Sequence, residues 1–265
     1  MSDRVDLYNS TYSNFNEQVL AEIRKETYGE DIGQNSWITA DEYDIFFSWL
    51  GLPPQASVLE VASGSGGPAL YLARKHQCRI MGIDINEEGL KKAKDAAQSA
   101  QINADFQFAD MEKGLPFEAE SFDGVMCIDS MNHFHDRLAV LREWNRVLRA
   151  GGHILFTDPV VVTGPVSNEE LAVRSNIGFF LFVPPEVTEG FIREAGFSQL
   201  RRQDVTENIE LTSERWYAAR QARRDALVRI EGEERYEGLQ RFLGAVHKLS
   251  SERRLSRFVY VAVKK

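Results

Sequence analysis

The chain has 265 residues, of which 43% are hydrophobic and 27% charged, as is typical of one globular unit with a large core. Its net charge of −9 argues against general affinity for nucleic acid or anionic membranes, and its apolar runs are too short to span a bilayer. Cys78 and Cys127 have no Cys/His cluster nearby, and the start "MSDRVDLYNS" does not resemble a secretory signal. We therefore expect buried free thiols, a cytoplasmic location and no metal site.

The first fifty residues carry two helical patterns. "NEQVLAEIRKETYG" places apolar residues at helical spacing and ends at Gly29. "TADEYDIFFSWLGL" begins at Thr39, a good capping residue, and ends before Gly51. A polar loop, "YGEDIGQNSW", joins them, and "PP" then precedes the first strand. We predict an N-terminal helical cap or lid over 1–50 and a core unit over 51–265.

Strand and helix patterns alternate after this cap. "SVLEVA", "CRIMGIDI", "ADFQFAD", "FDGVMCIDS" and "HILFTDPV" are predicted strands, and helical patterns lie between most of them. This alternation indicates right-handed βαβ units and a parallel sheet. Two more strand-like segments, "SQLRRQDV" and "SRFVYVAVKK", follow. Insertions are predicted at 159–184 and at 206–255, and the second has a helical pattern.

The segment "EVASGSGG", which begins at Glu60, is a glycine-rich turn of the kind that binds nucleotides. A triphosphate site is excluded because no Lys and Ser/Thr pair follows the last glycine. A dinucleotide fits the spacing alone, since Gly64, Gly66 and Ala69 match G-x-G-x-x-A and Asp84 lies 20 residues on. Glu60, however, would repel a pyrophosphate and suits a cation such as an amino-acid ammonium.

Five motifs, in order, resemble those of the class I S-adenosylmethionine-dependent methyltransferases. They are "VLEVASGSGG", "GIDI", "FADMEKGLPF", "SFDGVMCIDSMNHF" and "REWNRVLRAGGHILFTD", with Ala62 and Ser63 where Gly-Cys is commoner. The match covers roughly residues 55–160 and is most similar to the small-molecule branch, with its ubiquinone-biosynthesis and sarcosine/phosphoethanolamine types. The resemblance implies a Rossmann-like α/β fold with a seven-stranded, mostly parallel sheet, an antiparallel last strand and helical insertions.

The resemblance also implies where the cofactor, S-adenosyl-L-methionine, would bind. Asp84 would hold the ribose hydroxyls, and Asp110 would lie near the adenine. Glu60 would lie near the methionine part. The full predicted set is Glu60, Ala62, Ser63, Gly64, Gly66, Asp84, Ile85, Asp110, Met111 and Ile128, with Gln34 and Trp37 (and Tyr28) covering the cofactor from the N-terminal loop. The alternatives are that the two aspartates cap the next turn or helix, that Glu60 faces solvent, and that the loop residues only pack.

The acceptor side is less well defined by the sequence. His133, in "IDSMNHFHD", is the candidate general base or acceptor-orienting residue, with a structural role as the open alternative. Arg174 and the phenylalanines of "RSNIGFFLFVPPE" form a candidate acceptor wall, or pack beneath a long loop. Trp216 or Tyr217 in the 206–255 insertion is expected nearest the acceptor, unless the insertion is a second layer on the sheet or a dimer contact.

These observations predict a metal-independent transfer of a methyl group to a small-molecule acceptor, with no nucleic-acid or membrane partner. The attacking atom (N, O or C) and the oligomeric state stay open. One alternative is an NAD-type dehydrogenase, although no second catalytic domain is recognisable. The other is a catalytically silent cofactor-binding or regulatory protein of the same fold, in which the cofactor motifs would look the same.

Overall fold

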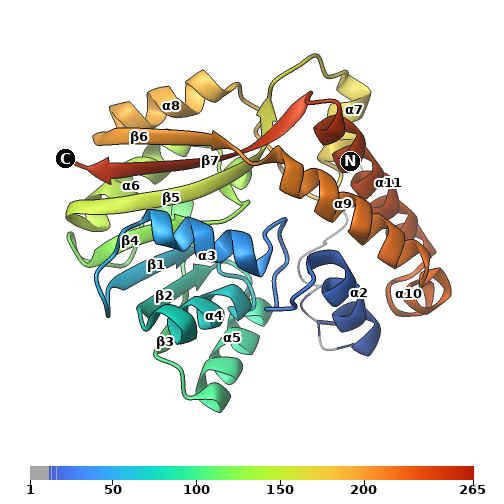
Figure 1. Cartoon of the computed structure of the whole chain (residues 1–265), viewed down its shortest axis with the longest axis horizontal. Coiled ribbons are helices and arrows are strands. Elements are labelled where there is room, and N and C mark those ends of the chain that lie inside the picture. Colours follow the sequence, from blue (N-terminus) through green and yellow to red (C-terminus); the bar gives the residue numbers. More distant parts are fainter. Residues whose placement is uncertain (1–11, 13, 16) are drawn as a thin grey trace.

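The computed structural model describes residues 12, 14, 15 and 17–265, and its centre is a seven-stranded sheet (Figure 1). The strand order is β3-β2-β1-β4-β5-β7-β6. The first five strands pair in parallel, whereas β7 is antiparallel to both β5 and β6. The strands are β1 (Ser57–Val61), β2 (Arg79–Asp84), β3 (Ala104–Phe108), β4 (Phe122–Cys127), β5 (Leu148–Val162), β6 (Phe197–Asp204) and β7 (Leu255–Lys264). The predicted mostly parallel sheet with an antiparallel last strand is confirmed.

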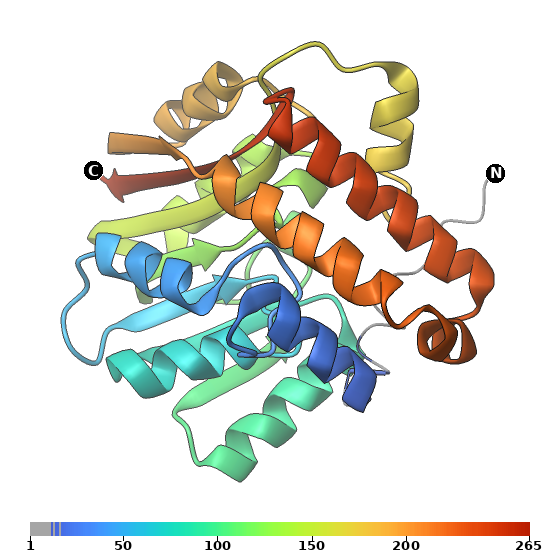
Figure 2. The same ribbon diagram turned by 45° about the vertical axis from the view of Figure 1, so that its right-hand side comes forward.

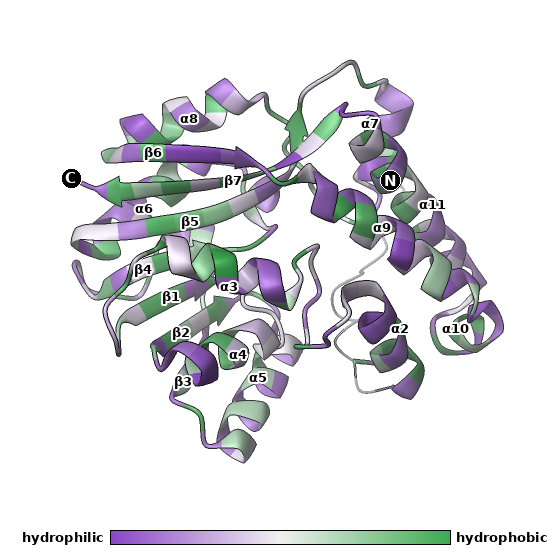
Figure 3. Ribbon diagram, viewed as in Figure 1, coloured by the Kyte–Doolittle hydropathy of each residue, from purple (hydrophilic) through white to green (hydrophobic). Residues whose placement is uncertain are grey.

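Alternating side chains of the strands form two separate cores, one on each face of the sheet. Val58 of β1 and Ile80 of β2 face α3 (Ala40–Trp49), α4 (Gly67–His76) and α5 (Glu87–Ala100). Leu59 and Ile83 face the opposite way, toward α6 (Arg137–Val147) and α8 (Pro185–Glu194). Successive residues of a strand point to opposite faces, so a sheet covered by helices on both sides needs nearly continuous apolar strands. In Figure 3 the edge strand β6 is accordingly the hydrophilic one.

The remaining helices form a layer beyond the carboxyl ends of the parallel strands (Figures 1 and 2). They are α2 (Gln18–Tyr28), α7 (Asn168–Arg174), α9 (Thr206–Gln221), α10 (Arg224–Glu231) and α11 (Glu233–Ser251). Ile23 of α2 packs with Ala219 and Tyr236 of the insertion, and Arg223 pairs with Glu26. The predicted cap over 1–50 thus has two parts, since α2 joins this helical layer whereas α3 packs on the sheet.

Capped helix starts and short 3-10 turns lie at the carboxyl edge of the sheet. Thr39 caps α3 by accepting from the backbone N–H of Glu42, and Asn86 caps α5 in the same way. Two short 3-10 turns, η1 (Met111–Lys113) and η2 (Met131–His133), follow β3 and β4 at that edge. Among the described residues, no helix combines the length and apolar character needed to cross a membrane.

Candidate functional site

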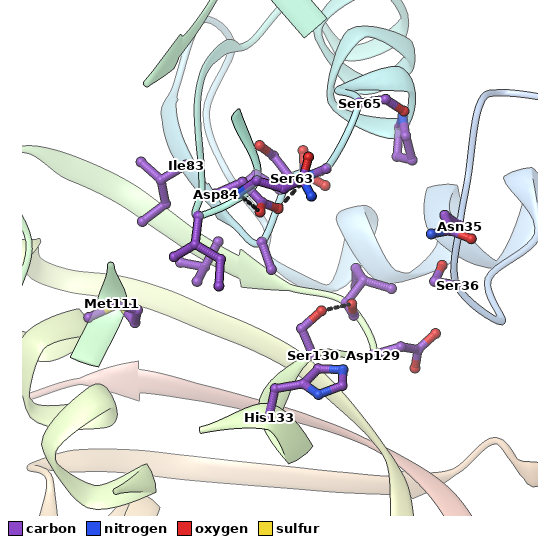
Figure 4. A pocket seen from close by; sticks show the side chains of 18 of the residues that line it. Asn35, Ser36, Ser63, Ser65, Ile83, Asp84, Met111, Asp129, Ser130 and His133 are labelled. Carbon is purple, nitrogen blue, oxygen red and sulfur yellow. Dashed lines mark hydrogen bonds between the residues drawn. The ribbon is translucent and has the colours of Figure 1, made fainter. Parts of the chain in front are cut away.

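A cavity of about 490 Å³ lies at the carboxyl ends of β1, β2 and β4. This volume is within the range of small-molecule sites, and this edge is where open α/β sheets bind ligands. Figure 4 shows Ser63 and Asp84 on one side of the cavity, with Asp129, Ser130 and His133 facing them from the other. The lining residues come from the glycine-rich turn, the ends of β2 and β4, η1, the N-terminal loop 33–38 and the segment 177–179.

The glycine-rich turn has a backbone that few side chains tolerate. Gly64 has φ +55°, and a Cβ there would collide with the side chain of Tyr12. Ala62 also has a positive φ of 59°, which is uncommon for a residue with a side chain. Gly66 was predicted to bind cofactor, but it lies outside the cavity lining. It is the N-cap residue of α4 at φ +73°, and a Cβ there would meet Ala93 and Phe106, so close packing requires a glycine at this position.

Glu60 is buried, with its carboxyl group on the cavity wall. The Tyr43 hydroxyl donates to Oε1, whereas Oε2 has no hydrogen-bond partner among the described residues. Burial raises the pKa of Glu60 to about 7; the Tyr43 hydrogen bond opposes this shift and the nearby Asp84 charge adds to it. A buried carboxylate oxygen without a donor is costly, and a ligand that brings a cationic donor would satisfy it.

Two further buried polar atoms on the wall also lack a partner among the residues described, namely Ser63 Oγ and Asn35 Nδ2. Together with Glu60 Oε2 they offer a donor and two acceptors to a bound molecule. Buried polar groups in folded proteins are normally satisfied, so three residues of one cavity wall that each carry an unsatisfied polar atom favour a polar ligand there. The residues present therefore fit a zwitterionic amino-acid group, such as the methionine end of the predicted cofactor.

Asp84 lines the cavity and also braces the two turns beside it. Its Oδ2 accepts from Gly64 N at 2.8 Å and its Oδ1 accepts from Asn86 N at 2.8 Å. Burial raises the pKa of Asp84, and these backbone hydrogen bonds oppose the shift. Because each carboxylate oxygen has two lone pairs, both can still accept from a ligand hydroxyl. The bracing role and the predicted ribose-binding role are therefore compatible.

The predicted adenine side is an open rim of the cavity. Ile85 lines it and is 65% exposed, which leaves an apolar face for a planar ring. Asp110 lines it too, but its Oδ1 caps η1 through Glu112 N and its Oδ2 pairs with Lys113 at 2.8 Å. Met111 is buried, with its sulfur 3.3 Å from the Trp144 indole nitrogen. The capping alternative for Asp110 is thus seen alongside its place on the cavity wall.

His133 lies at the opposite end of the cavity from Asp84, beside Ile128 and Ser130 at the end of β4. Its Nδ1 is 2.9 Å from the carbonyl oxygen of Phe179. A carbonyl oxygen only accepts, so Nδ1 carries the proton and the neutral ring has its lone pair on Nε2. Burial lowers the pKa of His133; the Phe179 carbonyl and Asp158 oppose this shift, while the Arg174 charge adds to it. The imidazole is therefore neutral at pH 7 and able to accept a proton.

Asp129, which follows Ile128 at the end of β4, lines the cavity although the sequence reasoning missed it. It has a positive φ of 52°, and its carboxylate accepts from Trp37 N at 3.0 Å and from Arg257 Nε at 2.7 Å. Arg257 in turn binds both oxygens of Glu42, at 2.8 and 2.7 Å. The position of Asp129 in "CIDS", just after a predicted strand, could have marked it as a site residue. Its partner Arg257 on β7 is 128 residues away and could not be predicted from the sequence.

The loop residues predicted to cover the cofactor, Tyr28, Gln34 and Trp37, lie outside the cavity lining. Trp37 packs its ring against Trp216 and Phe242, while its backbone N–H binds Asp129 and its carbonyl accepts from Asn208 at 2.8 Å. Gln34 folds back on its own loop, where it binds Ile32 N and Glu30 O, and the Tyr28 hydroxyl donates to Ser36 O. These side chains shape the loop. The lining comes from Gly33, Asn35, Ser36 and Ile38.

The two insertions contribute less to the cavity than predicted. Phe179 lines it with Ile177 and Gly178, but Arg174, Phe180 and Phe182 do not. No residue of 206–255 is among the lining residues that the structure describes. Trp216 instead packs against Trp37 and Tyr28, so the insertion contacts the N-terminal segment that carries the loop 33–38 and not the cavity itself. Within 12, 14, 15 and 17–265, no three His, Cys, Asp or Glu side chains are grouped to hold a metal ion.

Comparison with known proteins agrees with this site. A family model described as a methyltransferase domain matches residues 59–156, which include the glycine-rich turn and the ends of β2 and β4. A 27-O-demethylrifamycin SV methyltransferase of Amycolatopsis mediterranei is 29% identical over 202 residues, which are 71% of this chain and 74% of that protein. A sarcosine/dimethylglycine N-methyltransferase of Halorhodospira halochloris is 30% identical over 159 residues, which are 60% of this chain but only 57% of the relative.

The fold comparison reaches further along the chain than the sequence comparison. The cyclopropane synthase MmaA2 from Mycobacterium tuberculosis superposes with a TM-score of 0.81 at 18% identity, over 97% of both chains. At this identity the match establishes the fold alone. Taken together, the strand order, the site at the carboxyl edge and the matched domain make residues 59–156 similar to a methyltransferase domain, and the two sequence relatives named above are methyltransferases.

Proposed function

We propose that the protein transfers a methyl group from S-adenosylmethionine to a small molecule that binds at the His133 end of the cavity. One observation carries this proposal: a single cavity joins the partnerless carboxylate oxygen of Glu60, the Asp84 carboxylate and the neutral imidazole of His133. The first two suit an aminoacyl group and a ribose, and the third suits an acceptor that must lose a proton.

The cofactor, when bound, supplies an electrophilic methyl group on a sulfonium. On this proposal Glu60 Oε2 accepts from its ammonium group, and the oxygens of Asp84 accept from its ribose hydroxyls. Ile85 packs against the adenine at the exposed rim, and Asp110 accepts from the adenine amino group. The protein would act mainly by aligning the acceptor and by excluding water from the cavity.

The acceptor residues are assigned by their place at the His133 end of the cavity, opposite Asp84, which we call the inner end. His133 takes a proton from the acceptor or orients it, and Phe179 and Ile177 form an apolar wall beside it. The relatives named above are an N-methyltransferase and a methyltransferase of an O-demethyl substrate, so the attacking atom is not decided by similarity. The metal independence, the cytoplasmic location and the lack of a nucleic-acid partner remain predictions from the sequence.

The proposal is tested by titrating the full chain with S-adenosylmethionine and with NAD in a calorimeter, and by following transfer of a labelled methyl group to a panel of acceptors. We expect micromolar or tighter binding of S-adenosylmethionine, no binding of NAD, and turnover of at least one acceptor. Tight binding of NAD would overturn the cofactor assignment. Cofactor binding without turnover of any acceptor would favour the catalytically silent alternative.

A further inference from the structure

The lining of the cavity is strongly unbalanced in charge. Its described residues include five carboxylates and neither lysine nor arginine. The carboxylates are Glu60, Asp84, Asp110, Glu112 and Asp129. In a partly enclosed cavity charges interact more strongly than in water, so this lining disfavours any bound anion.

The carboxylates are not spread evenly along the cavity. Four lie at the ends of β1 and β2 and on the η1 rim, where Asp110 pairs with Lys113 and Glu112 pairs with His135. The fifth, Asp129, follows the end of β4 and shares the single positive charge of Arg257 with Glu42, so no net positive charge remains there for an anion. Besides Asp129, the inner end, where the acceptor would bind, is lined by uncharged groups: Asn35, Ser36, Ser130, His133, Phe134, Ile177, Gly178 and Phe179.

Two buried arginines, Arg174 and Arg257, are directed at other groups of the protein. Arg174, which the sequence suggested for an acidic acceptor, is 1% exposed, with its guanidinium 5.0 Å from the Phe180 ring centre and 4.9 Å from that of Phe242. Arg257 is fully buried between Glu42 and Asp129. Neither guanidinium is among the cavity-lining groups. A carboxylate or phosphate at the inner end would therefore lose its water and gain no cationic partner.

The inner end suits a neutral hydroxyl group on an apolar body. Phe179, Phe134 and Ile177 offer apolar surface to a ring or chain, and the imidazole of His133, whose Nδ1 is 2.9 Å from Phe179 O, lies beside them. A site built to hydrogen-bond a hydroxyl also discriminates strongly against compounds that lack one, because its polar group is then left unpaired.

Building on the proposed methyl transfer, we propose that the acceptor is an uncharged hydroxyl compound with an apolar ring or chain, and that carboxylate and phosphate acceptors are rejected. In the step, the hydroxyl oxygen forms a bond to the methyl carbon as the carbon–sulfur bond breaks. The electron pair of that bond stays on sulfur, and the hydroxyl proton passes to Nε2 of His133. The products are a methyl ether, S-adenosylhomocysteine and a protonated imidazole, which returns its proton to water.

The test measures binding of size-matched pairs to the full chain saturated with S-adenosylhomocysteine. 2-Naphthol and 2-naphthoate form one such pair, and a panel of phenols and alcohols with their carboxylate counterparts extends it. We expect the hydroxyl member of a pair to bind at least tenfold more tightly. Equal or tighter binding of the carboxylates overturns the proposal, and so does a failure of every hydroxyl compound in the panel to bind.

A variant can supply the missing positive charge without disturbing the fold. Gly178 lies in the lining, and a Cβ added there would have no heavy atom within 4 Å. Gly178→Lys should shift the preference toward the carboxylate by at least fivefold, whereas the neutral, matched Gly178→Gln should leave the preference within twofold of the native value. An unchanged preference in the lysine variant would contradict the charge argument.

Parallel turnover assays separate this proposal from the methyl transfer on which it rests. Selective binding of hydroxyl compounds without transfer of the labelled methyl group would refute the proposed function and support the acceptor preference. Methylation of carboxylates or phosphates with an equal or higher kcat/KM would refute the acceptor preference and support the proposed function.

Discussion

Replacing Glu60 with glutamine should weaken S-adenosylmethionine binding and remove its dependence on pH. Glu60 is buried on the cavity wall, and only its Oε1 has a partner among the described groups, the Tyr43 hydroxyl. A glutamine keeps the size of the side chain and can still accept from Tyr43. It loses the negative charge that an ammonium group would need, so the change isolates the electrostatic contribution.

The expected magnitude follows from the raised pKa of Glu60. With a pKa of about 7, caused first by burial, the carboxyl is roughly 3% ionised at pH 5.5 and about 50% ionised at pH 7. An α-amino group stays protonated over this range, so binding that needs the carboxylate should strengthen about fifteenfold from pH 5.5 to 7. At pH 7.5 the loss of one charge-assisted hydrogen bond, about 1.5–3 kcal/mol, should weaken binding by roughly ten- to 150-fold.

The stability of Glu60→Gln is an independent measurement, and it should rise where the affinity for the cofactor falls. The folded protein holds the Glu60 proton more tightly than the unfolded chain, whose pKa is the ordinary 4.5, so native stability falls as pH rises from 4.5 to 7. Glu60→Gln removes this fall. The free energy of unfolding at pH 7.5 should therefore rise, by roughly 3 kcal/mol at most. A variant that is more stable but binds cofactor less well identifies a carboxylate kept for binding.

Calorimetric titrations of native protein, Glu60→Gln and Glu112→Gln between pH 5.5 and 7.5 would measure these effects. Glu112 is an exposed carboxylate on the cavity rim, so the same substitution there controls for a general loss of negative charge, and its affinity should stay within about threefold of native. A native affinity that does not change with pH, or an undiminished affinity in Glu60→Gln, would refute the assignment of Glu60 to the ammonium.

Further predictions concern the other parts of the site. Asp84→Ala should weaken S-adenosylmethionine binding more than tenfold because two hydroxyl contacts are lost, and unchanged affinity by calorimetry would remove Asp84 from the site. His133→Gln should lower kcat on a hydroxyl acceptor by a factor of about 10²–10⁴. It should also abolish the fall of kcat at acid pH, which lies below pH 6.5 because burial lowers the pKa of His133. A variant that keeps the native pH profile would show that His133 is not the general base. Asn208→Ala removes the hydrogen bond to the Trp37 carbonyl. It should therefore increase amide hydrogen exchange over 30–38 and raise KM for S-adenosylmethionine several-fold, with kcat retained. Unaltered exchange would show that this contact does not hold the loop. Activity should survive EDTA, and restoration of a chelated, inactive enzyme by magnesium would contradict metal independence.

The sequence by itself was enough for the fold class and for the edge of the sheet where the cavity lies. Alternating strand and helix patterns indicate a parallel sheet because each unit folds from neighbouring residues, and parallel strands end at one edge. Glu60, Asp84 and Asp110 each lie at or just after the end of a predicted strand, so the same local pattern brought them to one cavity. A glycine at a tight turn is equally a local requirement, as Gly64 shows.

Only the tertiary structure decided how that cavity is closed. The Trp37 backbone is held by Asp129, 92 residues away, and by Asn208, 171 residues away, and these pairings leave no periodic signal in the sequence. Tryptophan is a residue type that often lines ligand sites. The ring of Trp37 is nevertheless buried against Trp216 and Phe242 in the helices of the insertion. An aromatic side chain gains by burial in either a ligand site or a core, and the choice depends on which distant helices pack beside it.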